Sequence, residues 1–532
     1  MLYPPGHPDH VESLSSLASY YELRMNRGGA SPRPDYPGTT ANLTIEQVVS
    51  NIVSDVLKAF PLRLLDAHSG MLCDRGAQIL HFKNSQQYKQ LVSSKSTLDT
   101  PPQTARIREV VSTYFQYATL SHRWGTFEPL LRDIKEKIIY DLDPNDGLLK
   151  LQSFCLATLR HGHIWAWSDT CCIDKESSAE LQEAIGSMYS WYQQSVLTVV
   201  HLADVSDTSP LTSSEWFKRG WTLQELLAPR FLLFFTRDWK LYRGISSNHK
   251  ENNVILRELK QATGIASGLL SSFHPGVDDA RARLQWASTR DTTRSEDMAY
   301  SLFGVFGLHL PVLYGESAEN ALGRLLAEVI SKSDDTSILD WVGQPSAFHS
   351  CFPHSIRPYK TPLQPSLSRT ASPNIQYGHQ SVTSVREMHH ALSNLSRTQF
   401  VKPRLFLPCI VHRVSFMDVP IRMGTAATHV HRICATGLEP IEVTLSQPLE
   451  RNPPSYILIR PWRSDLLDEF VMHHYPSTWQ WLAMMQQPFS ALLLKQLRQN
   501  EYRRVATSCH ILACPTTSNG ALEGEVTTLT IV

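Results

Sequence analysis

Between residues 117 and 239 the sequence alternates short apolar runs with segments whose apolar residues recur at helical spacing. This alternation constrains the fold most, because strands and helices that alternate along a chain are typical of a parallel, doubly wound sheet. Ligands of such sheets bind beyond the carboxyl ends of the strands. The expected strands are YATLSHRWG (117–125), HIWAWSDTCCID (163–174), VLTVVHLADV (196–205) and RFLLFFTRDW (230–239). Residues 121–125 and 168–172 are therefore expected at a ligand-binding edge.

The helix expected between the second and third strands is the best marked. It covers residues 177–195, with Ser177 or Ser178 as its N-cap. Its apolar face is expected to carry Leu181, Ile185, Met188 and Tyr192. Helical spacing also recurs over residues 45–60, while residues 61–74 predict a short hairpin.

Downstream of the α/β pattern, residues 280–307 and 318–333 are predicted to be amphipathic helices. RLFLPCIVHRVSF, HVHRICATG, PIEVTLSQ and SYILIRPW then predict β-strands. We therefore expect five parts. They are a partly disordered N-terminal extension (1–60), an α/β domain (61–240), its helical extension (241–343), a Pro-, Ser- and His-rich linker (344–385) and a β-rich or mixed C-terminal region (386–532).

Composition excludes several classes of function. Lys plus Arg and Asp plus Glu number 50 each, so no net charge attracts nucleic acid or an anionic membrane. No long apolar run predicts a membrane span, and the N-terminus lacks a secretory signal pattern. The 9 scattered cysteines favour a reducing, cytoplasmic location over a disulfide framework. Neither phosphate-binding glycine motif, that of Rossmann dehydrogenases or that of P-loop NTPases, is present.

The stretch SSEWFKRGWTLQELLAP (213–229) contains the first candidate for chemistry. If a helix begins near Arg219, Trp221 and Glu225 lie one turn apart on one face, while leucines anchor the turn in a core. A carboxylate held beside an indole in this way is a candidate functional group. The alternative is a structural acid paired with Arg219 or Arg230.

Polar residues that follow the first two strands form the rest of the predicted site. Ser121, His122 and Arg123 end the first strand and Asp169 follows the second. Together with Glu225 they could surround one small ligand. The structural alternatives are a turn-capping role for Asp169 and an ion pair for Arg123.

Histidines and cysteines near the second strand suggest two weaker alternatives. His161, His163, Cys171 and Cys172 are too irregularly spaced for a typical zinc site. A Cys–His nucleophilic pair is equally weak, because Cys172 precedes an apolar residue and is expected to pack. No metal site is therefore predicted.

Several motifs together resemble the long form of the fungal HET (heterokaryon incompatibility) domain. They are RLLD (63–66), YATLSHRWG (117–125), IWAWSDTCCIDKESSAELQEAIGSMYSWYQQS (164–195), EWFKRGWTLQELLAP (215–229) and SEDMAYSLFGVFGLHLPVLYGE (295–316). The resemblance covers roughly residues 62–340. His122 with Arg123 departs from the tyrosine or threonine of many members.

The HET domain is in turn similar to the TIR fold, so the resemblance implies a TIR/flavodoxin-like doubly wound sheet. WTLQEL (221–226) is similar to a segment of plant TIR domains whose glutamate is needed to cleave NAD, and that glutamate corresponds to Glu225. The resemblance thus implies a catalytic Glu225, and the positions of Ser121, His122, Arg123, Asp169 and Trp221 predict that they bind the substrate. NAD would be the substrate, with no other cofactor.

Two functions are consistent with this resemblance. The first is a cytoplasmic incompatibility effector that triggers cell death by hydrolysing NAD at the nicotinamide–ribose bond. The second is a non-enzymatic signalling scaffold that acts by TIR-like self-association, with Glu225 as a structural acid. An incompatibility partner protein fits either function, and nucleic acid fits neither.

Overall fold

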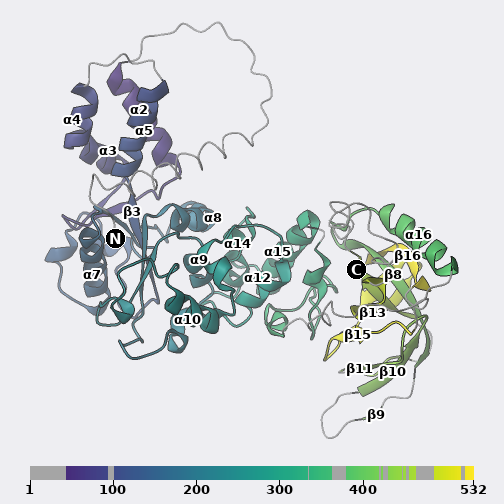
Figure 1. The fold of residues 1–532 in the computed structure, drawn as a ribbon. Helices are drawn as coiled ribbons and strands as arrows, with labels where there is room; N and C mark the ends of the chain where they lie inside the picture. The colour runs from purple at the N-terminus through teal and green to yellow at the C-terminus, as the bar shows by residue number, and fades with distance from the viewer. Residues whose placement is uncertain are drawn as a thin grey trace, which may run out of the picture. The chain divides into compact units, whose positions relative to one another are not determined.

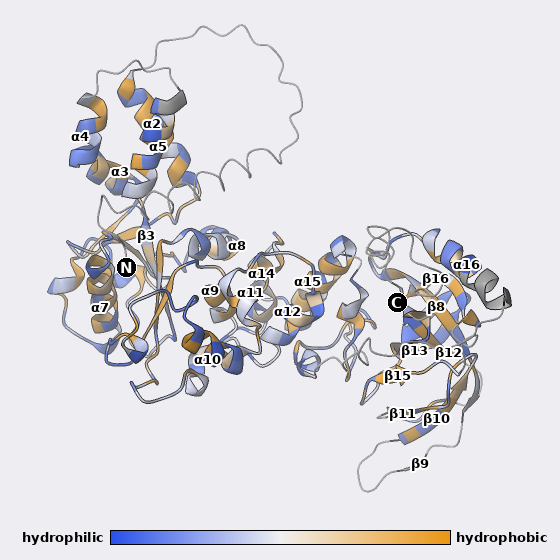
Figure 2. Ribbon diagram, viewed as in Figure 1, coloured by the Kyte–Doolittle hydropathy of each residue, from blue (hydrophilic) through white to orange (hydrophobic). Residues whose placement is uncertain are grey.

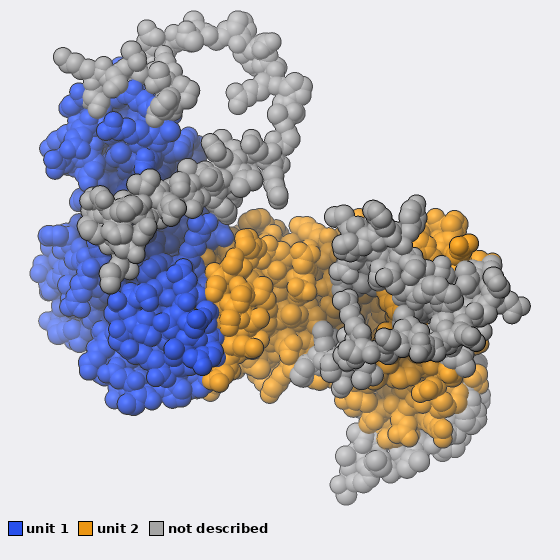
Figure 3. All heavy atoms as spheres, viewed as in Figure 1, with its two compact units in different colours: residues 1–174, 193–213, 229–258 blue, residues 175–192, 214–228, 259–532 orange. Residues whose placement is uncertain are grey.

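The computed structural model describes residues 44–93, 101–333, 335–361, 379–417, 421–422, 429–445, 447–450, 455–462, 484–516 and 522–532. The chain forms two compact units whose segments interleave along the sequence (Figure 3). Unit 1 comprises Met1–Asp174, Gln193–Ser213 and Pro229–Glu258, and unit 2 comprises Lys175–Tyr192, Ser214–Ala228 and Leu259–Val532. The predicted domain boundaries at residues 240 and 343 stay predictions.

Unit 1 contains a six-stranded sheet in the order β2-β1-β4-β3-β5-β6. Its strands are β1 (Leu64–Asp66), β2 (Met71–Cys73), β3 (Tyr117–His122), β4 (Trp165–Trp167), β5 (Leu197–His201) and β6 (Leu232–Phe235). Within this order, the neighbouring strands β4, β3, β5 and β6 are parallel to one another. β1 and β2 form an antiparallel hairpin against β4. The predicted alternation of strands and helices is confirmed, with an antiparallel hairpin at one edge.

The parallel strands lie where the apolar runs predicted them, and every residue in them is buried. β3, β4, β5 and β6 are buried along their whole length. Strands of a parallel sheet are covered on both faces, which explains continuous apolar runs in place of alternation. The hairpin predicted at residues 61–74 is also confirmed, with Gly70 in its turn at φ +74°.

Helices of unit 1 precede and connect these strands (Figure 1). They are α2 (Ile45–Lys58), α3 (Arg75–Asn84), α4 (Gln86–Ser93), α5 (Pro101–Tyr114), α6 (Leu131–Ile134) and α7 (Asp146–Arg160), with α10 (Asn253–Thr263) beginning at the end of the unit. A capping box between Thr44 and Gln47 begins α2. Apolar residues on α2 and α5 meet where the two helices pack together (Figure 2). The helix predicted at residues 45–60 is thus confirmed. The partly disordered extension was predicted for residues 1–60, of which residues 1–43 lie outside the described residues.

The first part of unit 2 is helical. Its helices are α8 (Ser178–Gln194), α9 (Thr222–Leu227), α11 (Ser267–Ser271), α12 (Ala280–Ala287), α13 (Asp297–Tyr300), α14 (Phe303–Phe306) and α15 (Ala318–Ser333). The main-chain N–H of Glu180 donates to the Ser177 hydroxyl, so the predicted N-cap of α8 is confirmed. The continuous helix predicted over residues 280–307 is wrong, because residues 288–296 leave helical geometry between α12 and α13.

The second part of unit 2 is a ten-stranded sheet whose central strands close into a ring. Its strands are β7 (Gln399–Val401), β8 (Arg404–Met417), β9 (Ile421–Arg422), β10 (His429–Ala435), β11 (Ile441–Leu445), β12 (Tyr456–Pro461), β13 (Phe489–Arg498), β14 (Glu501–Arg504), β15 (Ile511–Ala513) and β16 (Glu525–Ile531). The ring runs β8-β12-β13-β14-β16 and closes because β16 also pairs with β8. All four strands predicted in this region are confirmed.

The predicted linker at 344–385 begins with packed residues. Cys351, Phe352 and Tyr359 are fully buried. Helix α16 (His379–Ser393) begins before the linker was expected to end, and its Met388 and Leu392 pack against Ile410. Among the described residues, no helix is long and apolar enough to cross a membrane.

Candidate functional site

Two buried histidines lie side by side at the carboxyl ends of β3 and β5. His122 and His201 are partners in the parallel register, so both side chains leave the sheet on the same face. The two residues are 6% and 7% exposed. The ring of His201 stacks on Trp239 with a centroid distance of 4.5 Å. The carboxyl end of the sheet therefore carries two buried imidazole rings, and the Trp239 ring stacks on that of His201.

A buried carboxylate and a lysine complete this cluster. Glu128 Oε2 lies 3.4 Å from His122 Nε2, an ion-pair contact without the alignment of a hydrogen bond. Lys150, on α7, donates to Glu128 Oε1, and its Nζ also lies 3.5 Å from the Arg123 carbonyl oxygen. The side chains of Glu128 and Lys150 are 5% and 11% exposed. The cluster thus fixes the loop that follows β3 onto α7.

Burial and charge shift the pKa values in this cluster. Burial alone would raise the pKa of Glu128, but the close contact with His122 and the hydrogen bond and charge of Lys150 outweigh it and lower the pKa to about 2. Burial lowers the pKa of His201 to about 4; the Arg237 carbonyl opposes this shift, and the Lys150 charge adds to it. At neutral pH, Glu128 is therefore ionised and His201 is neutral.

Gly147 lets α7 approach the loop that carries Glu128. A Cβ at this position would lie 1.9 Å from the main-chain oxygen of Phe127. We expect Gly147→Ala to lower the free energy of unfolding by about 1–3 kcal/mol, because the main chain at residues 127–128 must move. Gly186, exposed on α8, is the matched control, because a Cβ there meets no atom within 4 Å. Urea denaturation that showed equal stability for Gly147→Ala and Gly186→Ala would contradict this close approach.

The predicted residues at this edge divide into buried and accessible groups. Ser121 and His122 are buried and support the edge from inside. Arg123 is exposed, and its guanidinium pairs with no acid among the described residues, so the structural ion pair considered for it is not found. Asp169 Oδ2 accepts a hydrogen bond of 3.0 Å from Trp124 Nε1. Asp169 thereby joins the loops after β3 and β4.

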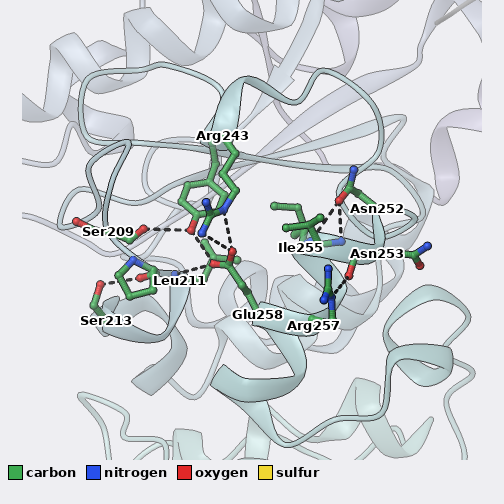
Figure 4. Close-up of polar contacts among 12 residues, drawn as sticks. Ser209, Leu211, Ser213, Arg243, Asn252, Asn253, Ile255, Arg257 and Glu258 are labelled. Carbon is green, nitrogen blue, oxygen red and sulfur yellow. Dashed lines mark hydrogen bonds and ion pairs between the residues drawn. The ribbon is translucent and has the colours of Figure 1, made fainter.

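The loop after β5 is held by Glu258 on α10 (Figure 4). One carboxylate oxygen of Glu258 accepts from the Leu211 main-chain N–H at 3.3 Å and from the Tyr242 hydroxyl at 2.7 Å. The other oxygen accepts from Arg243 Nε at 2.7 Å. Since Tyr242 also donates to the Ser209 carbonyl at 3.1 Å, the segment that leaves the carboxyl edge of the sheet is fixed in place.

Trp221 and Glu225 lie at the start of α9, in unit 2. The main-chain N–H of Glu225 donates to the Trp221 carbonyl at 3.4 Å, which confirms the predicted spacing of one turn. Every residue of α9 is buried, and Glu225 is 6% exposed. Its charge acts on Arg290: burial lowers the pKa of this guanidinium to about 10, and Glu225 opposes that shift. Arg290 was not among the arginines considered as partners of Glu225, and the predicted pairing with Arg219 or Arg230 stays a prediction.

The six predicted site residues fall into two groups. Unit 1 holds Ser121, His122, Arg123 and Asp169, whereas Trp221 and Glu225 belong to unit 2. Neither unit by itself contains all six. Their convergence on one ligand stays a prediction.

Among the described residues, no group of three or more His, Cys, Asp or Glu side chains is arranged to hold a metal ion. Cys171 and Cys172 are buried, and hydrogen bonding to Cys172 together with burial raises the pKa of Cys171. A buried thiol with a raised pKa is a poor nucleophile.

Glu128, Lys150 and His201 were missed by the sequence analysis. His201 could have been found, because it lies inside the predicted strand 196–205 as the sixth residue, just as His122 is the sixth residue of the predicted strand 117–125. Glu128 and Lys150 carry no local signal. The two residues are 22 positions apart in the sequence, and only the packing of α7 brings their side chains together.

Comparisons with known proteins agree with the motifs in this region. Residues 117–212 match a family described as Heterokaryon incompatibility protein (HET). The chain is also 41% identical over 235 residues to the Vegetative incompatibility protein HET-E-1 of Podospora anserina. That similarity covers 41% of this chain and 16% of the relative, so the chain matches only a small part of that protein. No solved structure matches this chain.

Proposed function

We propose that this chain is an effector of fungal non-self recognition, or heterokaryon incompatibility, and that it triggers cell death by hydrolysing NAD. The HET match over residues 117–212 and the 41% identity to an incompatibility protein carry the biological part of this proposal. The chemical part depends on Glu225. By the resemblance of WTLQEL (221–226) to plant TIR domains, Glu225 would correspond to the glutamate that those domains need to cleave NAD.

The strand order supports a TIR-like arrangement. When β3, β4, β5 and β6 are numbered in chain order, they lie in the order 2-1-3-4. The flavodoxin-like sheet begins with the same order and binds its ligand beside its first and third strands, which are neighbours at the point where the strand order reverses. In this chain those strands are β3 and β5, whose carboxyl ends carry His122 and His201. We assign the NAD-binding edge to this position.

The reaction would break the bond between ribose C1′ and the nicotinamide nitrogen. The bonding electrons pass to the pyridinium nitrogen, so nicotinamide leaves as a neutral molecule and needs no general acid. Water adds to C1′ and loses a proton, giving ADP-ribose. The carboxylate of Glu225 would stabilise the oxocarbenium-like transition state, while Trp221 forms a wall of the site.

The remaining predicted residues would bind the rest of NAD. Arg123, exposed and without an acidic partner among the described residues, is suited to the diphosphate. Asp169 is suited to a ribose hydroxyl, while Ser121 and His122 support the loop that presents Arg123.

The first experiment measures NAD loss and nicotinamide release by the purified protein at several protein concentrations. We expect Glu225→Gln to lower the rate by about 30- to 1000-fold, equivalent to about 2–4 kcal/mol of transition-state stabilisation. Glu215→Gln is the matched control. It makes the same charge change at a partly exposed acid that pairs with Lys218. Undiminished turnover by folded Glu225→Gln would remove Glu225 from the mechanism.

A non-enzymatic scaffold is the second candidate function. The effect of Glu225 on buried Arg290 favours it, because a carboxylate that balances a buried guanidinium has a structural role without catalysis. Self-association without NAD loss would support the scaffold. Sedimentation over the same range of protein concentration measures this self-association.

A further inference from the structure

The segment 290–297, which runs from the loop after α12 to the first residue of α13, contacts the chain just before α9. The Gly220 main-chain N–H donates to the Asp291 carbonyl at 2.9 Å, and the Asp291 N–H donates to the Lys218 carbonyl at 2.7 Å. The two segments therefore pair like neighbouring parallel strands over this short distance. These bonds fix the residues that precede Trp221.

Arg290 and Thr292 tighten the same contact. A guanidinium nitrogen of Arg290 donates to the Arg219 carbonyl at 2.9 Å and to the Thr222 hydroxyl at 3.0 Å. A Cβ at Gly220 would lie 2.5 Å from the Thr292 methyl carbon, so only glycine permits this approach. The first turn of α9 is thus held from outside by a segment about 70 residues further along the chain.

The side chain of Asp297 contacts Trp221 directly. Its Oδ2 accepts a hydrogen bond of 3.2 Å from Trp221 Nε1. Asp297 is 9% exposed and begins α13. Burial raises the pKa of its carboxyl group, and hydrogen bonds from Trp221 and Tyr314 oppose that shift. A buried acid with this partner orients the indole ring.

We propose that Asp297 is a positioning residue, which fixes the Trp221 indole and thereby the first turn of α9, so that Glu225 is presented in one orientation. The step from Trp221 to Glu225 is short, because the Trp221 carbonyl accepts the main-chain N–H of Glu225. The functional consequence rests on the proposed NAD hydrolysis. The structural coupling between Asp297 and Trp221 does not.

Fluorine NMR of protein labelled with 5-fluorotryptophan tests the coupling directly. The chain has 12 tryptophans, and the resonance that Trp221→Phe removes identifies Trp221. We expect Asp297→Ala to shift and broaden this resonance, and Asp297→Asn to change it less, because its amide oxygen still accepts from the indole. Asp291→Ala is the matched control, since the exposed Asp291 contacts residues 218–220 through its main chain.

NAD turnover by the same variants tests the consequence. Asp297→Ala should lower kcat by about 10- to 100-fold and leave KM within about threefold, because a misplaced carboxylate affects the transition state more than binding. Asp297→Asn should recover most of this loss, and Asp291→Ala should behave as wild type.

The outcomes separate this proposal from the proposed function. A Trp221 resonance that Asp297→Ala leaves unchanged overturns the positioning role, and so does full turnover by this variant in an otherwise active protein. If the wild-type protein does not cleave NAD, the proposed function fails, and the fluorine resonance alone decides whether Asp297 positions Trp221.

Discussion

Replacing Arg504 by methionine is expected to lower the free energy of unfolding of unit 2 by about 3–5 kcal/mol. Arg504, on β14, donates to the Leu339 carbonyl at 2.7 Å and to the Trp341 carbonyl at 2.6 Å. Its guanidinium also lies 3.8 Å from the centroid of the Trp341 ring. Methionine keeps most of the side-chain volume but leaves the buried Trp341 carbonyl without this donor, which costs about 1–3 kcal/mol. It also removes the charged donor to the Leu339 carbonyl, which then accepts only from the Trp341 main-chain N–H at 3.1 Å.

Two further variants separate this effect from a general loss of charge. Arg504→Lys keeps the charge but lacks the planar fork, so we expect an intermediate loss. The neighbouring Arg503 is exposed on the same strand, and Arg503→Met should change stability by less than about 0.5 kcal/mol. Urea denaturation that is monitored by hydrogen exchange in residues 336–341 reports on the contact itself. Equal losses from Arg503→Met and Arg504→Met would contradict the role of the two carbonyl bonds.

The sequence predicted elements whose pattern reflects local burial. The strands β3 to β6 are buried throughout, and β11 alternates buried and exposed residues, so both types leave a clear pattern. Residues 280–307 were predicted as one helix, although residues 288–296, between α12 and α13, are all polar. These residues are not helical. Arg290 and Asp291 bond instead to residues 218–220, and this tertiary contact leaves no local pattern in the sequence.

The candidate site was predictable only where strand ends determine it. His122 and Asp169 follow strands and lie where expected at the edge of the sheet. Pairings across long sequence distances could not be predicted, such as those of Glu128 with Lys150 and of Trp221 with Asp297. Strand periodicity also left open which of the adjacent Arg503 and Arg504 faces inward, because both assignments fit an alternating strand.

Removing the carboxylate of Glu128 is expected to destabilise unit 1 by about 3–5 kcal/mol, because Glu128→Ala leaves the Lys150 ammonium buried without its partner. Glu109, an exposed acid on α5, provides the matched control, and Glu109→Ala should have little effect. The double variant Glu128→Leu with Lys150→Met should recover much of the loss, because an apolar pair avoids the desolvation of both charges. Failure of the double variant to recover stability would mean that the cluster acts through contacts other than this ion pair.

The same carboxylate determines how unit 1 responds to acid. The folded pKa of Glu128 is about 2, below its usual 4.5, so its stabilisation is present above pH 4.5 and is lost as the pH falls toward 2. The shift corresponds to stabilisation on the order of 3 kcal/mol. His201 acts in a higher window: its folded pKa of about 4 lies below its usual 6.5, so acidification from 6.5 to 4 protonates the unfolded chain first. Urea denaturation at a series of pH values should therefore show two successive losses. Glu128→Gln should remove only the lower one, and a lower loss that persists in Glu128→Gln would assign it to other carboxylates.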